Sequence, residues 1–192
     1  MARAKQVQVD ATGFAGRLST ADDTTQKALA TLDGIAFPSE SVVAEWVPDN
    51  GGPNEVFISG TDAFVYEIVS GKGVVLNLEL PENVDLAVNP VLEILYAVSA
   101  TGGAGGTVAF ALDAKYVAAG TENLNKVDDE ALTSTPTVTN TLSRLHRLTF
   151  TLDRTKLAAG DGMTFHLQRT GGTFDGDIGI FRNAKFRFTG TT

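Results

Sequence analysis

Two histidines and a few clustered acidic residues are the side chains in this sequence that could do chemistry. His146 and His166 lie in different segments. A transition-metal site on a β fold typically uses two histidines two residues apart with a glutamate shortly after them, and neither histidine has such neighbours. We therefore expect no metal, with His146 as a structural histidine, its hydrogen bonds satisfied, at the mouth of a core and His166 pointing outward.

The acidic clusters favour structure over catalysis. Asp128-Asp129-Glu130 and the pair Asp175 and Asp177 could supply oxygen ligands to calcium, which takes six to eight, but they lack EF-hand spacing. Asp175-Gly176-Asp177 is more simply a turn before a strand. A glycosidase-like carboxylate pair is defined by a distance that sequence does not give. The sequence contains no nucleophile elbow, phosphate loop or dinucleotide fingerprint, so we predict a protein that is not an enzyme and has no cofactor.

Composition excludes several other classes. The 192 residues include no cysteine and carry a net charge of −8, which argues against nucleic acid as a partner. No apolar run approaches the roughly 20 residues of a membrane helix, so we expect no membrane partner. A basic start at residues 1–5 is followed by polar residues 6–10, where a signal peptide would have its apolar core. We expect synthesis in the cytoplasm.

Alternation of apolar and polar residues with a period of two dominates the last two-thirds of the chain and indicates strands with one buried face. The alternating segments are 74–80, 92–98, 108–116, 148–152, 163–167, 178–180 and 184–188. Breaks rich in glycine, proline and Asp/Asn separate them. With a long surface excursion over 119–136, they predict an all-β, antiparallel double-sheet jelly roll of about eight strands over residues 61–192.

The N-terminal part has a different character. Residues 1–36 predict an extended arm and one short helix, which Thr20 caps at its start and Gly34 ends. A short helix with such a narrow apolar stripe is only marginally stable alone in water, so it should dock on its own domain or on a partner. Residues 37–60 predict a connector with short strands near 42–47 and 56–59, in which Trp46 is a packing anchor. The stripe consists of Thr25, Ala28, Leu29 and Leu32.

Two predicted strands are apolar on both faces, so both faces should be covered. The residues opposite the expected core positions are Val91, Leu95, Ala97, Ala109 and Ala111. Their cover is either the chain's own arm or connector, or a neighbouring subunit. We treat these five residues as a candidate trimer interface.

Several ordered features resemble the jelly-roll domain of small virion proteins of tailed bacteriophages. They are Leu78–Asp85, Gly106–Leu112, the long excursion, Leu148–Leu152 with Leu157–Asp161, Met163–Arg169 and Phe174–Asp177. Gly13–Ser19 and Thr25–Asp33 resemble a short module that recurs in phage fibre, spike and capsid-associated proteins.

This resemblance implies a homotrimer in the virion: a head-decoration (cement) protein that binds the major capsid protein and stabilises the head lattice. The alternative is a tail-fibre or baseplate component that recognises a host-surface glycan through loops such as 119–136, and a cell-wall hydrolase is a third, weaker possibility. As a decoration protein, the chain would contact the capsid or a neighbouring subunit through its N-terminal part. The expected contact residues are Phe14, Leu18, Thr25, Ala28, Leu29 and Leu32.

Overall fold

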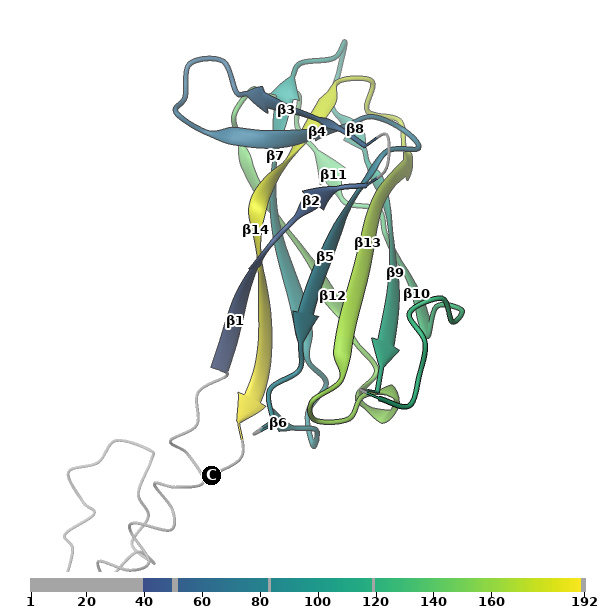
Figure 1. The fold of residues 1–192 in the computed structure, drawn as a ribbon. Helices are drawn as coiled ribbons and strands as arrows, with labels where there is room; N and C mark the ends of the chain where they lie inside the picture. The colour runs from purple at the N-terminus through teal and green to yellow at the C-terminus, as the bar shows by residue number, and fades with distance from the viewer. Residues whose placement is uncertain (1–39, 50–51, 83, 119, 191–192) are drawn as a thin grey trace, which may run out of the picture.

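Two antiparallel β-sheets pack face to face in the computed structural model, which describes residues 40–49, 52–82, 84–118 and 120–190 (Figure 1). The expected arm and helix over residues 1–36 lie outside the described residues. The described part confirms the all-β, antiparallel double-sheet fold. It contains no helix with the length and apolar character that a membrane span requires.

The larger sheet has seven strands around β14. In spatial order these are β12 (Leu145–Thr151), β7 (Val91–Ala100), β14 (Asp177–Gly190), β4 (Phe64–Ile68) and β3 (Asn54–Phe57), with β1 (Glu40–Glu45) and β6 (Val84–Asp85) also paired to β14. Strand β7 follows one side of β14, and on the other side β4 is succeeded by β1. The pairing with β7 is irregular between Ile180 and Ala184, where this change of partner occurs.

The smaller sheet has five strands and covers the other side of the core. Its order is β10 (Glu130–Ser134), β9 (Ala109–Val117), β13 (Gly162–Gly171), β5 (Gly73–Glu79) and β2 (Val47–Pro48). A two-stranded ribbon of β8 (Gly106–Thr107) and β11 (Thr137–Val138), and a 3-10 turn at Arg154–Lys156, complete the described elements.

The core lies between the two sheets, and the period-two pattern predicts its residues correctly. Phe110 and Phe165 from the smaller sheet and Phe186 from the larger are all 0% exposed. Their neighbours in sequence point outward, because successive side chains on a strand alternate between faces. The inner faces of the two sheets interdigitate to form one continuous apolar cluster.

Residues 37–60 were expected to form a connector outside the jelly-roll domain. This expectation is wrong from Glu40 onward, because these residues belong to the sandwich. Strand β1 pairs with β14, β2 with β5 and β3 with β4. Trp46 is fully buried in the core, as expected of a packing anchor. These strands are short, and Pro48 occupies an edge strand, where a missing amide donor is tolerated. The short strands expected near 42–47 and 56–59 overlap β1, β2 and β3, but strands this short do not show from sequence that they join the two sheets.

The excursion at residues 119–136 is also shorter than expected. Its second half, Glu130–Ser134, is strand β10 at the edge of the smaller sheet, paired with β9. Only the first half forms a loop, which projects at the side of the sandwich near β9 and β10 (Figure 1). Strand β10 was missed because one of its buried positions holds a glutamate, which breaks the apolar pattern.

Substitution of core and surface residues tests this register. Phe110→Ala and Phe150→Ala should each lower the free energy of unfolding by about 3–5 kcal/mol, because each removes a buried aromatic ring. Thr149→Ala should lower it by less than about 1 kcal/mol, because Thr149 is exposed on the outward face. Urea unfolding of the three variants provides the measurement, and equal losses at Thr149 and Phe150 would contradict the register.

Candidate functional site

The outward face of the seven-stranded sheet carries large apolar side chains, which we call the apolar face: Val43, Leu95, Leu145 and Phe181. Val43 and Leu145 are 62% and 55% exposed, and the other two are partly buried. Val43 lies opposite Lys185 on β14, and Leu145 lies opposite Ala97 on β7. These four side chains come from four strands, but charged side chains lie among them, because Glu93, Arg147 and Lys185 line the same hollow as Val43 and Leu95.

The β3–β4 hairpin lies at one end of the sandwich (Figure 1). Phe57 and Phe64 are cross-strand partners on this hairpin, with ring centroids 4.0 Å apart and nearly perpendicular rings. Each ring is about half exposed, at 51% and 50%. Two adjacent exposed aromatic rings make an apolar patch of the kind that is enriched at protein interfaces.

Two hollows lie on this side of the molecule and meet at Leu95 and Asn183. One, of about 360 Å³, is also lined by Phe64 and Phe181. The other, of about 320 Å³, is also lined by Val43. Both border the irregular segment of β14, because the register shift there opens the surface between the hairpin and β1. Phe64 borders the first hollow, but along β4 it alternates with Val65, which packs on the outward face, and shares the side of Tyr66 and Ile68, which face the core.

Charged side chains border the apolar residues. Glu93, whose side chain is only 12% exposed, lies 2.5 Å from Arg187 and 3.9 Å from Arg147. Arg182 pairs with Glu45 on β1 and, at 3.2 Å, with Glu55 on β3. Charged side chains therefore lie among the exposed apolar side chains of this face, and not only around them.

The structure separates the five residues of the predicted trimer interface. Val91, Leu95 and Ala97 point outward from the seven-stranded sheet, whereas Ala109 and Ala111 point outward from the five-stranded sheet. The two groups do not form one surface. Ala97 is buried by the chain's own Ile58 and Val65, so at this position the cover is the chain itself.

Gly179 makes this local cover possible. It lies between Ala97 and Glu67 in the sheet, and a Cβ atom there would come within 2.3 Å of a Val65 methyl group. Ile58 and Val65 pack there because β14 has no side chain at this point. The expected capsid contacts in the arm, from Phe14 to Leu32, lie outside the described residues.

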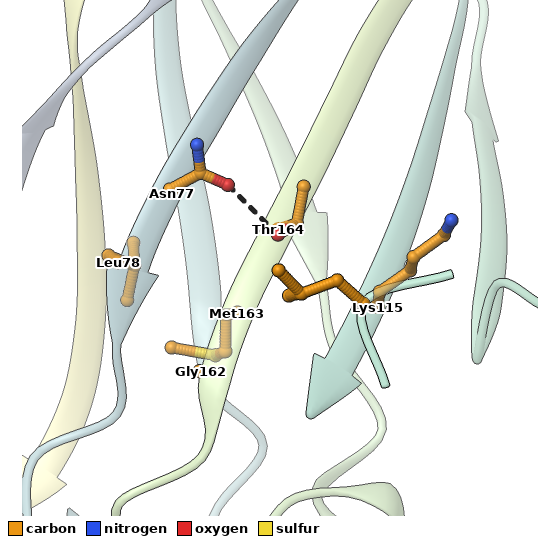
Figure 2. A pocket seen from close by; sticks show the side chains of 7 residues that line it. Asn77, Leu78, Lys115, Gly162, Met163 and Thr164 are labelled. Atoms are coloured by element: carbon orange, nitrogen blue, oxygen red, sulfur yellow. Dashed lines mark hydrogen bonds between the residues drawn. The ribbon is translucent and has the colours of Figure 1, made fainter. Parts of the chain in front are cut away.

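The opposite, five-stranded sheet presents a polar groove, which we define by Asn77, Lys115, Thr164, His166 and Asp113. Asn77, Thr164 and Lys115 form one row across β5, β13 and β9, and His166 and Asp113 are neighbours in the next row. The Thr164 hydroxyl donates a 2.9 Å hydrogen bond to the Asn77 carbonyl oxygen (Figure 2). Sequence analysis placed His166 outward but did not detect this constellation, because the rows depend on register between strands far apart in sequence.

The loop before β10 borders the groove and is tied to β9. The Lys126 ammonium donates to the Tyr116 carbonyl at 2.7 Å and pairs with Glu122 at 3.0 Å. The Asp129 carboxylate accepts the Tyr116 amide at 2.7 Å. The pKa of Glu122 is lowered, chiefly by the hydrogen bond that its carboxylate accepts from the Ala118 amide and next by the bond from Lys126. The bond to Glu122 in turn raises the pKa of Lys126.

Glu130 is the buried acidic residue that sequence analysis placed in a surface cluster. Its carboxylate accepts a 2.7 Å bond from the Tyr116 hydroxyl and a 2.8 Å bond from the Asp153 amide. Burial raises the pKa of Tyr116 strongly, and the bond to Glu130 raises it further. Asp128 and Asp129 instead pair with Lys115 and Lys126, so the three carboxylates of this acidic cluster face different partners.

The two histidines differ in their surroundings. His166 Nε2 lies 2.9 Å from Asp49 Oδ2. His146 stacks on Tyr96 with ring centroids 5.0 Å apart, and its pKa is lowered by burial and by Arg144. The expectation that its hydrogen bonds are satisfied is wrong for Nε2, which is buried without a partner among the described residues. Among the residues that the structure describes, no three His, Asp or Glu side chains are grouped so that they could hold a metal ion.

Comparison with known proteins gives similarity at the level of structure. No known protein family and no curated protein sequence matches the chain. The xylan-binding module CBM15 is 15% identical, with 81% of this chain and 100% of that one covered and a TM-score of 0.46. The CBM22-1 xylan-binding domain from Paenibacillus barcinonensis Xyn10C is 10% identical, with 81% and 99% covered and a TM-score of 0.46. Latent PorU from Porphyromonas gingivalis is 10% identical; 81% of this chain but only 13% of PorU is covered, with a TM-score of 0.45. At these identities the similarity concerns the fold alone.

The Tyr116–Glu130 hydrogen bond gives a testable pH dependence. A tyrosine in the unfolded chain titrates near pH 10, while folded Tyr116 keeps its proton to higher pH. The unfolded state therefore loses protons first, and the stability from Tyr116 is present below about pH 10 and lost as pH rises above it. Tyr116→Phe should make this alkaline loss shallower, as measured by urea unfolding between pH 7 and about 11.

Tyr96→Phe is the control for that measurement. Burial raises the pKa of Tyr96 to about 12. Tyr96 therefore also contributes stability that is lost at alkaline pH, and this contribution remains in the Tyr116→Phe variant. At pH 7 Tyr116→Phe should cost about 1–3 kcal/mol because Glu130 loses a donor. The Tyr96 hydroxyl makes no hydrogen bond within the described residues, so Tyr96→Phe should cost less. An unchanged alkaline slope in Tyr116→Phe would show that this hydroxyl is not held in the folded state.

Proposed function

We propose that this chain is a structural protein of a tailed-phage virion rather than an enzyme, and that it acts as a homotrimeric decoration protein that binds and reinforces the capsid lattice. The observation that carries the proposal is the group of exposed apolar side chains on the outward face of the seven-stranded sheet and on its hairpin. The resemblance of the sequence to virion jelly-roll proteins supports the virion assignment. The capsid partner is the major capsid protein, and the site of action is the assembled particle.

The apolar surface needs a cover because its side chains are exposed together. Monomeric soluble proteins rarely expose large contiguous apolar patches, whereas single exposed apolar residues are ordinary. Here the two hollows join Val43 on one side with Phe64 on the other through Leu95. We assign this surface to contact between copies of the chain.

A ring of three subunits would use different parts of the surface on each side of a contact, as cyclic assemblies do. The phenylalanine pair of the β3–β4 hairpin is a projecting element, and the hollows beside Leu95 can receive one. The five-stranded sheet would then face away from the contact, because it forms the opposite side of the sandwich. Apolar burial at such contacts adds stability only in the assembled state.

Solution mass and surface substitutions test the trimer. Light scattering of the wild-type chain at micromolar concentration should give about three times the 20.2 kDa chain mass. Val43→Asp with Leu145→Asp should weaken association at least about tenfold, because each side chain contributes up to about 1.5–3 kcal/mol when buried. Both residues are exposed in the single chain, so the fold should be retained.

Thr133→Asp is the matched control for the trimer experiment. Thr133 is exposed on β10 and lies opposite Ala111, on the outward side of the five-stranded sheet. Thr133→Asp should remain trimeric. A monomeric wild-type chain, or a trimer broken by Thr133→Asp but not by the Val43 and Leu145 double variant, would contradict the assigned interface.

Capsid attachment through the N-terminal part is tested with stripped heads. Leu29→Asp should abolish binding of the purified chain to capsids that lack this protein, because a charge in the expected apolar stripe opposes burial. Lys27→Asp, on the opposite side of the expected helix, should bind as the wild type does. Binding to heads unaffected by Leu29→Asp would exclude this anchor, and binding to host cells rather than heads would favour the tail-fibre or baseplate alternative.

A further inference from the structure

The floor of the polar groove on the five-stranded sheet is a row of outward side chains that runs across three strands. Strand β13 is paired on both sides along the groove, whereas β5 pairs with β13 throughout but with β2 only at Val74 and Val75. What the floor offers to a ligand is the amide of Asn77, the hydroxyl of Thr164 and the ammonium of Lys115. The Asn77 amide nitrogen makes no hydrogen bond within the described residues.

Two adjoining hollows extend the groove along the sheet and share Lys115 and Thr164. One has a volume of about 620 Å³ and adds the apolar side chains Leu78 and Leu124 (Figure 2). The other has a volume of about 310 Å³ and adds His166, Asp113 and Asp128. Together they provide an elongated site rather than a single closed pocket.

The wall of the groove is held in place before any ligand binds. Leu124 is 74% exposed, and the loop that carries it is tied to β9 by Lys126 and Asp129. An exposed apolar side chain on an anchored loop above a polar floor suits a ligand with one apolar and one polar side. Preorganisation of this kind reduces the entropic cost of binding.

The charges of the groove select against anions. Lys115 is 3.7 Å from Asp128, and the only other basic group, His166, is paired with Asp49. Asp113 lies beside His166 in the same row. Acidic groups therefore match or outnumber basic ones, and an anionic ligand would meet repulsion.

We propose that this groove binds a neutral oligosaccharide. Hydroxyls along such a chain can bond to Asn77, Thr164 and Lys115, while the C–H face of a sugar ring rests on Leu124. A peptide is the poorer fit, because extended peptides bind through backbone groups along an open sheet edge, whereas the row of Asn77, Thr164 and Lys115 offers side chains across the strands. The inference does not depend on trimer formation, since the groove and the apolar face lie on opposite sheets.

Titration with defined sugars tests the site. The probes are cellohexaose, maltohexaose and chitohexaose as neutral hexasaccharides, and hexagalacturonate as an acidic one, each followed by calorimetry or NMR up to about 5 mM. We expect at least one neutral probe to bind with a Kd below about 1 mM, which corresponds to about 4 kcal/mol of binding free energy. Hexagalacturonate should bind at least about tenfold more weakly than that probe.

Substitutions localise the binding to the groove. Thr164→Val and Leu124→Ser should each raise the Kd at least about threefold and together at least about tenfold, because they remove a hydroxyl contact and the apolar wall. Thr149→Val, on the outward face of the other sheet, is the matched control and should leave the Kd unchanged. The proposal is overturned if no neutral probe binds at about 5 mM, if hexagalacturonate binds more tightly, or if Thr164→Val has no larger effect than Thr149→Val.

Discussion

Strand β14 is the constraint on which the larger sheet depends. It pairs with β7 along one side, with β4 and then β1 along the other, and with β6 at its C-terminal end. The change of partner falls at an irregular step after Ile180, where Arg182 accepts the Trp46 amide through its carbonyl and pairs with Glu45 and Glu55 through its side chain. One residue thus links β1 and β3 to the strand that organises the sheet, and the hollows of the apolar face open at the same step.

The outward sides of the two sheets expose different kinds of side chain, and the pairing of the strands explains the difference. On the larger sheet, the irregular step and the missing side chain at Gly179 let Ile58 and Val65 pack locally but leave Val43 and Leu145 uncovered. On the smaller sheet, regular pairing produces straight rows of polar side chains. The larger sheet therefore exposes apolar side chains among charged ones, whereas the smaller sheet exposes polar rows, and we propose self-association for the first and a hydrophilic ligand for the second.

The strands with sustained alternation could be predicted from sequence, because period two along β7, β9 and β13 follows directly from strand geometry. The short edge strands could not be, since β2 is only two residues long and β10 buries Glu130, whose bond to Tyr116 no local pattern shows. The apolar face was partly predictable, through Leu95. Its exposed members and the groove depend on register between distant strands, which sequence does not give. The arm and its helix stay predictions.

Cryo-electron microscopy of intact virions tests the central claim most directly. We predict threefold density for this chain on the capsid surface, with the seven-stranded sheets facing one another across the subunit contacts and the five-stranded sheets facing solvent. Density at the tail tip or baseplate, single copies without a threefold arrangement, or the absence of the chain from particles would contradict a trimeric decoration protein.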